Sequence, residues 1–253
     1  MTSQSLSLKE RVLALRLHGL AARWGALGDS AWVEELVELE EAERSRRSHD
    51  CRIKKATIGA FKPMSDFDWK HPSKIDRVQV RELLELEFLG EKSNVVMVGP
   101  NGVGKTMIAK NIAHQAVLRG YSVRFVGASD MLADLASYDG STLRLRMKRY
   151  VQPKLLVIDE LGYLRYDNRY ADLLFEIVRQ RCELRAPIVV TTNKAFSEWS
   201  QIFESAPCLV TLIDRLCHRA EVVHLDGSSY RLKEAVAATE QRAARRRPKK
   251  TDK

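Results

Sequence analysis

The sequence predicts an α/β protein whose core is a five-stranded parallel sheet sandwiched by helices. Between residues 94 and 225, short apolar runs that suit buried strands alternate with segments of helical periodicity. A glycine-rich turn connects the first of these strands to a helix. The composition, with 45% hydrophobic and 30% charged residues, is that of a folded globular chain. Strands that follow one another with helices between them form parallel sheets covered on both faces.

Residues 1–60 are predicted to form a small N-terminal helical module. Ser7 and Glu10 have the spacing of a capping box at the start of a helix. A longer helix is expected over residues 30–47, because apolar residues recur there on one face. That face consists of Trp32, Val33, Leu36, Val37 and Leu39.

Residues 61–74 are predicted to be a linker, because prolines and scattered aromatic residues show no periodicity there. Phe67 and Trp69 are expected to pack on the neighbouring domain. That main domain is expected over residues 75–236. Residues 237–253 form a basic C-terminal tail that we expect to be disordered.

The main domain is expected to begin with a helix over residues 75–90. Five strands are expected at residues 95–98, 122–127, 155–159, 187–193 and 221–225. Helices are expected between them at residues 105–116, 130–138, 141–150, 169–184 and 209–220.

The turn GPNGVGKT, residues 99–106, fits the phosphate-loop (Walker A) pattern G-x-x-x-x-G-K-[ST] at every fixed position. Its glycines let the backbone curl so that successive N–H groups point at phosphate oxygens, and the following helix adds its positive N-terminus. Lys105 can reach the β- and γ-phosphates of a nucleotide, and the Thr106 hydroxyl can bind Mg²⁺. The predicted nucleotide-binding residues are Gly99, Pro100, Asn101, Gly102, Val103, Gly104, Lys105, Thr106 and Met107.

Two further strand ends carry the side chains that hydrolysis needs. Asp159 follows four apolar residues, and its carboxylate can hold Mg²⁺ directly or through water. Glu160 can orient and deprotonate a water molecule aimed at the γ-phosphate. Asn193 ends the next strand, where open parallel sheets place their ligands, and its amide can bond the same water or the γ-phosphate. The sequence therefore predicts an ATPase with ATP and Mg²⁺ as cofactors.

Positive charge is concentrated in three segments of a chain whose net charge is +9. Residues 44–55 hold six basic residues and one acidic residue, residues 143–154 hold five and none, and residues 242–253 hold seven and one. Such segments suit the phosphate backbone of duplex DNA, and contacts of this kind carry no base sequence information. For each segment taken alone, a solvated surface is the alternative.

The chain is expected to be cytoplasmic and to have no membrane partner. No apolar run approaches the roughly 18 residues that span a bilayer, and the N-terminus lacks the basic start and apolar stretch of a secretion signal. No C-x-x-C pair is present, which favours reduced thiols. The cysteines are Cys51, Cys182, Cys208 and Cys217.

In their order along the chain, the segments GPNGVGKT, LLVIDE, VVTTN and IDRLCHRA resemble AAA+ ATPases of the branch that contains helicase loaders of the DnaC kind. More closely, the chain resembles IstB-type transposition helper ATPases of bacterial insertion sequences. This closer likeness spans nearly residues 10–235 and includes LRLHGLAARW, FKPMSDFDW, IDELGYL and IDRLCHRAEVVHLDGSSYRLKE. Many families share the phosphate loop, whereas IDELGYL together with SYRLKE is much more selective.

The resemblance implies a P-loop NTPase fold of the additional-strand AAA+ type, in which the Asn193 strand lies between the Lys105 and Asp159 strands. It implies a homo-oligomer around duplex DNA, with ATP at the subunit interfaces and a transposase as partner that stimulates hydrolysis. An arginine of one subunit would act on the ATP of its neighbour. Arg215 matches the family position for that catalytic role, and Arg219 is the second candidate.

We expect no full C-terminal helical lid after IDRLCHRA, as in the lidless sites of the IstB-like group. Arg231 in SYRLKE is a further candidate for contact with the nucleotide. Whether residues 1–60 bind DNA or the transposase stays open at this point.

Three other functions fit parts of the pattern. A replicative helicase loader would share the fold and use the N-terminal helices to hold a helicase. A nucleotide-gated DNA-binding scaffold would keep every binding residue and make Glu160 incidental. A small-molecule kinase would need a substrate pocket and a lid, which the sequence does not predict.

Overall fold

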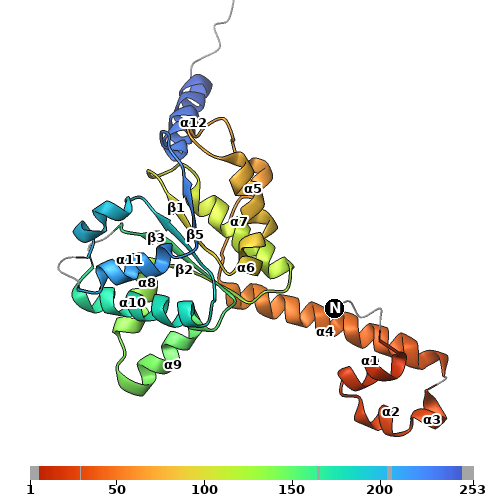
Figure 1. Ribbon diagram of the computed structural model, residues 1–253. Helices are drawn as coiled ribbons and strands as arrows, with labels where there is room; N and C mark the ends of the chain where they lie inside the picture. Colours follow the sequence, from red (N-terminus) through yellow and green to blue (C-terminus); the bar gives the residue numbers. More distant parts are fainter. Residues whose placement is uncertain (1–5, 29, 164–165, 204–206, 247–253) are drawn as a thin grey trace, which may run out of the picture. The chain divides into compact units, whose positions relative to one another are not determined.

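The computed structural model of the chain describes residues 6–28, 30–163, 166–203 and 207–246. Its internal contacts divide the chain into two compact units, Met1–Lys54 and Lys55–Lys253. Figure 1 shows the helices and strands of both units. Within the described residues, no helix is long and apolar enough to cross a membrane.

The first unit is helical, as predicted. It contains α1 (Leu8–Ala14), α2 (His18–Ala22), α3 (Trp24–Leu27) and most of α4 (Ala31–Ala56). The capping box is confirmed, because the Glu10 amide donates to the Ser7 hydroxyl while the Ser7 amide donates to the Glu10 carboxylate. The core of this unit consists of Val12, Leu15, Val33 and Val37.

The predicted apolar face of α4 is only partly buried. Val33 and Val37 are fully buried, whereas Trp32 and Leu39 are 49% and 63% exposed. Residues four apart lie on one line along a helix, and the short helices α1 to α3 supply core partners for that line alone. The predicted apolar face is therefore present in the sequence, but only Val33 and Val37 of its five residues are fully buried.

The basic segment 44–55 lies on α4, and several of its arginines are paired within the helix. The pairs are Arg44–Glu40, Arg46–Glu43, Arg46–Asp50 and Arg47–Glu43, with nitrogen–oxygen distances of 2.6 to 3.2 Å. Exposed pairs of this kind contribute little to stability. They nevertheless neutralise part of the positive charge that the sequence places in this segment.

The second unit is built on the predicted five-stranded parallel sheet. Its strands are β1 (Asn94–Val98), β2 (Val123–Gly127), β3 (Leu155–Leu161), β4 (Ile188–Thr192) and β5 (Ala220–His224). The order across the sheet is β2-β3-β4-β1-β5, and every neighbouring pair is parallel. This confirms the order implied by the family resemblance, because β4 lies between β1 and β3.

Helices cover both faces of this sheet. Successive strand residues point to opposite faces, so neighbouring residues of one strand contact different helices. Val95 and Met97 of β1 pack in the core with α5 and α7, whereas Val96 packs in the core with α8, α10 and α11. The helices are α5 (Arg77–Glu85), α6 (Glu87–Glu91), α7 (Lys105–Leu118), α8 (Ala128–Ala136), α9 (Gly140–Val151), α10 (Asn168–Glu183), α11 (Leu209–Cys217) and α12 (Tyr230–Arg246), with short 3-10 helices at Met64–Asp66 and Phe196–Gln201.

The helix expected over residues 75–90 is broken in two at Leu86, which has a φ angle of +65°. Leu86 and Phe88 are both buried in the core around α7. Two residues apart on a continuous helix would point to nearly opposite sides. The left-handed residue between α5 and α6 allows both side chains to reach the same core.

The segment 61–74, which the sequence predicts as a linker, is packed on the second unit. Phe67 is 8% exposed and belongs to the core around α7, and Trp69 packs against that core, as expected for both. The Asp226 amide donates to the Lys74 carbonyl oxygen at 2.9 Å, which fastens the end of the segment beyond β5.

Helix α12 covers part of the tail that we expected to be disordered, because it runs as far as Arg246. The rest of that tail, residues 247–253, lies outside the described residues. In the part of the chain that the structure describes, α12 is the one helix after β5, so no multi-helix lid is present there.

Candidate active site

The predicted phosphate loop connects β1 to α7. Gly102 and Gly104 have φ angles of +82° and +103°, in the left-handed region that glycine enters without steric penalty. Helix α7 begins at Lys105, so its free N-terminal amides and positive dipole lie at the end of the loop. The loop therefore has the backbone form of an anion-binding cradle.

Other segments press against the same glycines. A Cβ atom on Gly104 would lie 2.5 Å from the Phe67 ring, and one on Gly99 would lie 2.1 Å from the Leu225 carbonyl oxygen. Both distances are far shorter than a van der Waals contact. These glycines are thus required by tertiary packing as well as by the curl of the loop, a requirement that the sequence pattern does not reveal.

The Lys105 side chain is held within the loop. It is 5% exposed, and its Nζ atom donates to the carbonyl oxygens of Gly99 (2.6 Å) and Pro100 (2.8 Å). Burial lowers the pKa of Lys105 to about 8, with Asp159 opposing this decrease and Arg231 adding to it. A phosphate would be a stronger, charge-assisted partner than either carbonyl.

Thr106 and Asp159 meet at the end of β3, where the Thr106 hydroxyl donates to Asp159 Oδ1 at 3.1 Å. Hydroxyl and carboxylate oxygens are ligands that Mg²⁺ accepts. No group of three or more His, Cys, Asp or Glu side chains among the described residues is placed to hold a metal by itself. A Mg²⁺ ion at Thr106 and Asp159 would therefore take its other ligands from phosphates and water.

Glu160 occupies a distorted turn of β3. Its φ angle is +60°, and the pairing of β3 with β4 shifts register between Ile158 and Leu161. A bulge of this kind re-aims a side chain, and a left-handed glutamate costs of order 1–3 kcal/mol. Asp159 is buried while Glu160 is exposed. The two adjacent carboxylates therefore have different environments, one anchored and one open to solvent.

Asn193 follows β4 directly, so it lies one strand away from Asp159. Its Oδ1 atom is buried and has no hydrogen-bond partner among the described residues. A buried amide oxygen without a partner is costly, and a water or hydroxyl donor in the site would remove that cost. The polar groups present thus fit a bound nucleotide with its attacking water.

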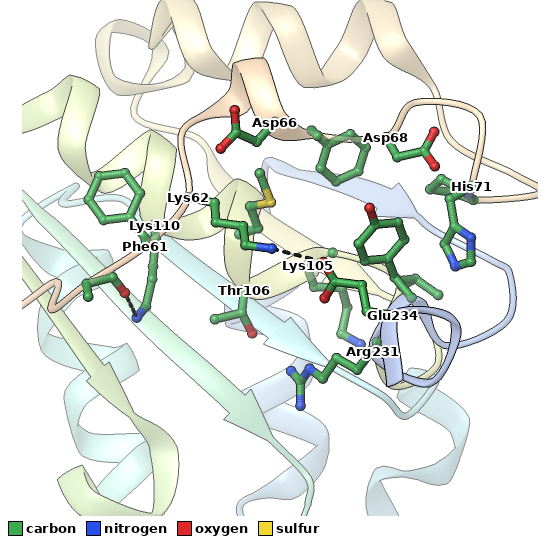
Figure 2. A pocket seen from close by; sticks show the side chains of 18 of the residues that line it. Phe61, Lys62, Asp66, Asp68, His71, Lys105, Thr106, Lys110, Arg231 and Glu234 are labelled. Atoms are coloured by element: carbon green, nitrogen blue, oxygen red, sulfur yellow. Dashed lines mark hydrogen bonds and ion pairs between the residues drawn. The ribbon is translucent and has the colours of Figure 1, made fainter. Parts of the chain in front are cut away.

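A cavity of about 290 Å³ opens beside the phosphate loop (Figure 2). The loop with the start of α7, the segment 60–72 and the start of α12 line it. Phe61, Phe67 and Met107 are apolar lining residues. The sequence prediction missed most of this lining because it assigned residues 61–74 to a linker. The signal that could have found it is the presence of aromatic residues in a segment without periodicity.

The three candidate arginines occupy different places. Arg231 lines the cavity near Lys105 of its own chain (Figure 2). Arg215 lies on α11, where its guanidinium is 5.9 Å from the centre of the Phe175 ring. Arg219 follows α11 and is exposed. Neither Arg215 nor Arg219 is among the described residues that line the cavity.

The predicted loop residues divide between core and surface. Val103 is buried, Met107 lines the cavity, and Pro100 and Asn101 are exposed. The exposed pair lies at the turn of the loop, where backbone rather than side chain is expected to meet phosphate.

The basic segment 143–154 lies largely on α9. Arg146 and Arg149 approach Asp134 at 3.1 and 3.9 Å. The basic residues exposed on α9 without such a contact in the described ion pairs are Arg144 and Lys148. The third basic segment, 242–253, is described only as far as residue 246.

Comparison with known proteins found a matching family, relatives of similar sequence and solved structures of similar fold. A family model described as IstB-like ATP binding protein matches residues 2–238. The chain is 35% identical over 241 residues to a protein of Geobacillus stearothermophilus named as an ATP-binding protein of insertion sequence IS5376, covering 90% of this chain and 96% of that protein. It is 34% identical over 192 residues to a protein of Pseudomonas aeruginosa named in the same way for IS21, covering 76% and 72%.

Solved structures that share the fold include those of DnaI and DnaA. The crystal structure of DnaI has a TM-score of 0.55 at 19% identity and covers 68% of this chain and 90% of that one. AMPPCP-bound DnaA from Aquifex aeolicus has a TM-score of 0.54 at 16% identity and covers 73% and 56%. These likenesses concern the fold alone. Because the family model matches nearly the whole chain and the phosphate loop has the expected form, the protein belongs to the family of IstB-like ATP-binding proteins.

Proposed function

We propose that this protein is a Mg²⁺-dependent ATPase that assembles on duplex DNA and assists a transposase. The observation that carries the catalytic part is the meeting of the phosphate loop with two strand ends. Thr106 donates to Asp159 of β3, Glu160 is the next residue of that strand, and Asn193 directly follows β4, which neighbours β3 in the sheet. The relatives support the biological part, since they are named for insertion sequences.

In the proposed reaction, the loop amides and Lys105 bind the phosphates. Lys105 exchanges two carbonyl partners for phosphate oxygens, and an anionic partner stabilises its charged form. Glu160 accepts a proton from the attacking water. Asn193 holds that water through its buried amide oxygen, which has no hydrogen-bond partner among the described residues.

Thr106 and Asp159 are the residues proposed to hold Mg²⁺. When bound, this ion would neutralise charge on the phosphates and so ease phosphoryl transfer. Asp159 supplies a carboxylate that is already positioned by its hydrogen bond with Thr106. The rest of the coordination is left to nucleotide and water, as is usual for Mg²⁺.

Arg231 is proposed to contact the nucleotide of its own chain, because it lines the same cavity as Lys105. Arg215 is proposed to act on the nucleotide of a neighbour in a homo-oligomer, with Arg219 as the second candidate. An arginine supplied in this way is worth about 10³–10⁵ in rate. Arg215 lies on α11 and is not among the described residues that line the cavity. This position supports action on the nucleotide of a neighbouring subunit.

Duplex DNA is proposed to contact exposed basic side chains on α9 and in the C-terminal segment. Arg144 and Lys148 are exposed on α9. Several arginines of α4, in contrast, already form ion pairs with glutamates of the same helix. Binding through phosphates would be independent of base sequence and would weaken steeply with salt. A replicative helicase loader is less well supported, because the likeness to DnaI and DnaA is one of fold.

Phosphate release by the full chain, with and without duplex DNA and a cognate transposase, tests this proposal. Glu160→Gln is expected to retain ATP binding and to lose at least about 10²-fold in turnover. Glu91→Gln, which neutralises an exposed carboxylate on α6, is the control and should hydrolyse ATP normally. Normal turnover by Glu160→Gln would exclude Glu160 as the base. A wild-type protein that binds ATP and DNA without any turnover would instead be a nucleotide-gated scaffold.

A further inference from the structure

Thr191, the fourth residue of β4, connects the two acidic residues of β3. Its side chain is fully buried. The Thr191 hydroxyl donates to Asp159 Oδ1, and its oxygen accepts a hydrogen bond from the Glu160 backbone amide at 2.9 Å. A single hydroxyl thus contacts the residue proposed to hold the metal and the residue proposed to activate water.

The direction of these hydrogen bonds is determined by the chemistry of the groups. A hydroxyl has one proton to donate and lone pairs to accept. The Glu160 amide can only donate and an ionised Asp159 carboxylate can only accept, so the hydroxyl proton must point toward Asp159. The chain of donors therefore runs from the Glu160 amide through Thr191 to Asp159, without an alternative orientation.

The distortion of β3 explains why a side chain is needed here. The regular pairing of β3 with β4 is interrupted between Ile158 and Leu161, and Glu160 has a φ angle of +60°. An amide in such an interruption loses its ladder partner, and a polar backbone group near the core needs a replacement. The Thr191 hydroxyl supplies that replacement from the neighbouring strand.

We propose that Thr191 is a positioning residue of this site. Its hydroxyl stabilises the left-handed turn that exposes the Glu160 side chain and holds the Asp159 carboxylate beside Thr106. Thr106 also donates to Asp159 Oδ1. If the Thr106 hydroxyl oxygen turned toward a metal, the Thr191 hydroxyl would still donate to Asp159 Oδ1. The kinetic consequence rests on the proposed ATPase function, whereas the hydrogen bonds are a property of the nucleotide-free protein.

The next residue of the strand provides a matched control. Thr192 is also fully buried, but its hydroxyl oxygen accepts from the Lys194 amide at 3.1 Å and has no hydrogen bond to Asp159 or Glu160 among the described contacts. Consecutive strand residues point to opposite faces. Thr191→Val and Thr192→Val therefore make the same chemical change on the two sides of β4.

The first measurement is amide hydrogen exchange in the nucleotide-free, full-length protein. Thr191→Val should speed exchange of the Glu160 amide by about tenfold, the effect of losing one hydrogen bond, while the Val157 and Val189 amides keep their protection. Thr191→Ser should restore protection, and Thr192→Val should leave the Glu160 amide unchanged. If Thr191→Val does not fold, Thr191→Cys, with a weak donor of similar size, takes its place. Unchanged exchange at Glu160 in the folded variant would overturn the proposed contact.

The second measurement is the dependence of ATP turnover on Mg²⁺. Thr191→Val should lower kcat by about tenfold or more and raise the Mg²⁺ concentration for half-maximal rate, with the KM for ATP nearly unchanged. Thr191→Ser should recover both values, and Thr192→Val should resemble the wild type. Unaltered kcat and Mg²⁺ dependence in Thr191→Val would overturn the positioning role. A wild-type protein without turnover would refute the proposed function instead, and the exchange measurement would still decide whether Thr191 holds Glu160.

Discussion

The Lys62 ammonium lies 3.0 Å from the Glu234 carboxylate, so the segment before α5 is tied to α12 beside the cavity (Figure 2). Asp68 and Lys233 form a second pair between the same two segments at 3.2 Å. Both segments line the cavity next to the phosphate loop. The two segments that line the cavity beside the phosphate loop are therefore joined by ion pairs between residues outside the phosphate-loop pattern.

Reversing the charge of Glu234 should speed the release of nucleotide. Glu234→Lys places two ammonium groups together, which should separate α12 from the segment before α5. The residues are 63% and 49% exposed, so solvent limits the effect to roughly 2–5-fold in the dissociation rate of a fluorescent ATP analogue. The double variant Lys62→Glu/Glu234→Lys should return to the wild-type rate. A slower release in Glu234→Lys would show that the added positive charge outweighs the lost contact.

Nucleotide affinity should decrease as the pH rises above 8. Burial lowers the pKa of Lys105 to about 8, so above that pH the free protein has a neutral amine that must take up a proton to bind phosphate. The dissociation constant should be flat below about pH 7.5 and should rise by up to about tenfold per pH unit above 8. Titration of Lys105→Arg, which stays charged, should give a flat profile.

The lowered pKa of Lys105 has the opposite effect on folding, because it makes the stability of the nucleotide-free protein increase with pH. Between pH 8 and the ordinary lysine pKa of 10.5, the unfolded chain keeps the Lys105 proton that the folded chain has released. Stability rises with pH wherever the unfolded state binds more protons. We therefore expect buried Lys105 to cost less free energy of unfolding at pH 10 than at pH 7. Denaturant unfolding of the nucleotide-free wild type and of Lys105→Met at both pH values would measure this difference.

Mixing of variants should distinguish arginines that act within a subunit from those that act between subunits. Arg215→Ala and Glu160→Gln should each be inactive, but their mixture should regain activity because the Glu160→Gln subunit still offers Arg215 to its neighbour. Arg231→Ala mixed with Glu160→Gln should stay inactive, since Arg231 lines the cavity of its own chain. ATPase rates at several mixing ratios provide the measurement. Recovery in the Arg231 mixture would show that Arg231 acts between subunits, and no recovery in the Arg215 mixture would exclude Arg215 from that role.

Gly99→Ala should destabilise the nucleotide-free protein. The added Cβ would lie 2.1 Å from the Leu225 carbonyl oxygen, so the chain after β1 must move away from the chain after β5. Overpacking of this kind costs about 1–3 kcal/mol, which thermal unfolding would report as a lower Tm. Gly90→Ala is the control, because its Cβ would meet nothing within 4 Å on α6. That variant should be neutral or more stable by up to about 1 kcal/mol.

The sheet and its strands could be predicted because each strand is defined by its own apolar run. The strand predicted at residues 122–127 is observed at Val123–Gly127. A strand that is buried on both faces has a continuous apolar sequence. The capping box at Ser7 was predictable in the same way, because it depends on two residues three positions apart. Local patterns of this kind need no knowledge of distant partners.

The helix boundaries were less predictable where tertiary burial decided them. The break at Leu86 allows two side chains to enter one core, and no local signal marks it. Helix α4 continues to Ala56 through a basic segment in which pairs of arginine with glutamate and aspartate three or four residues apart support the helix. The segment 61–74 lacks periodicity because it packs along the surface of the second unit, and its one regular element in the described residues is the short 3-10 helix Met64–Asp66.

The sequence by itself determined the chemistry offered at the sheet edge. Lys105, Asp159 and Asn193 each follow an apolar strand, so their types and order along the chain were readable from local pattern. Only the tertiary structure decided that Thr191 joins Asp159 to Glu160. It also decided that two distant segments, 60–72 and the start of α12, cover the cavity and bring Arg231 to it. The physical reason is that these contacts join residues far apart in the chain, and their formation depends on how the strands pair and which surfaces become buried.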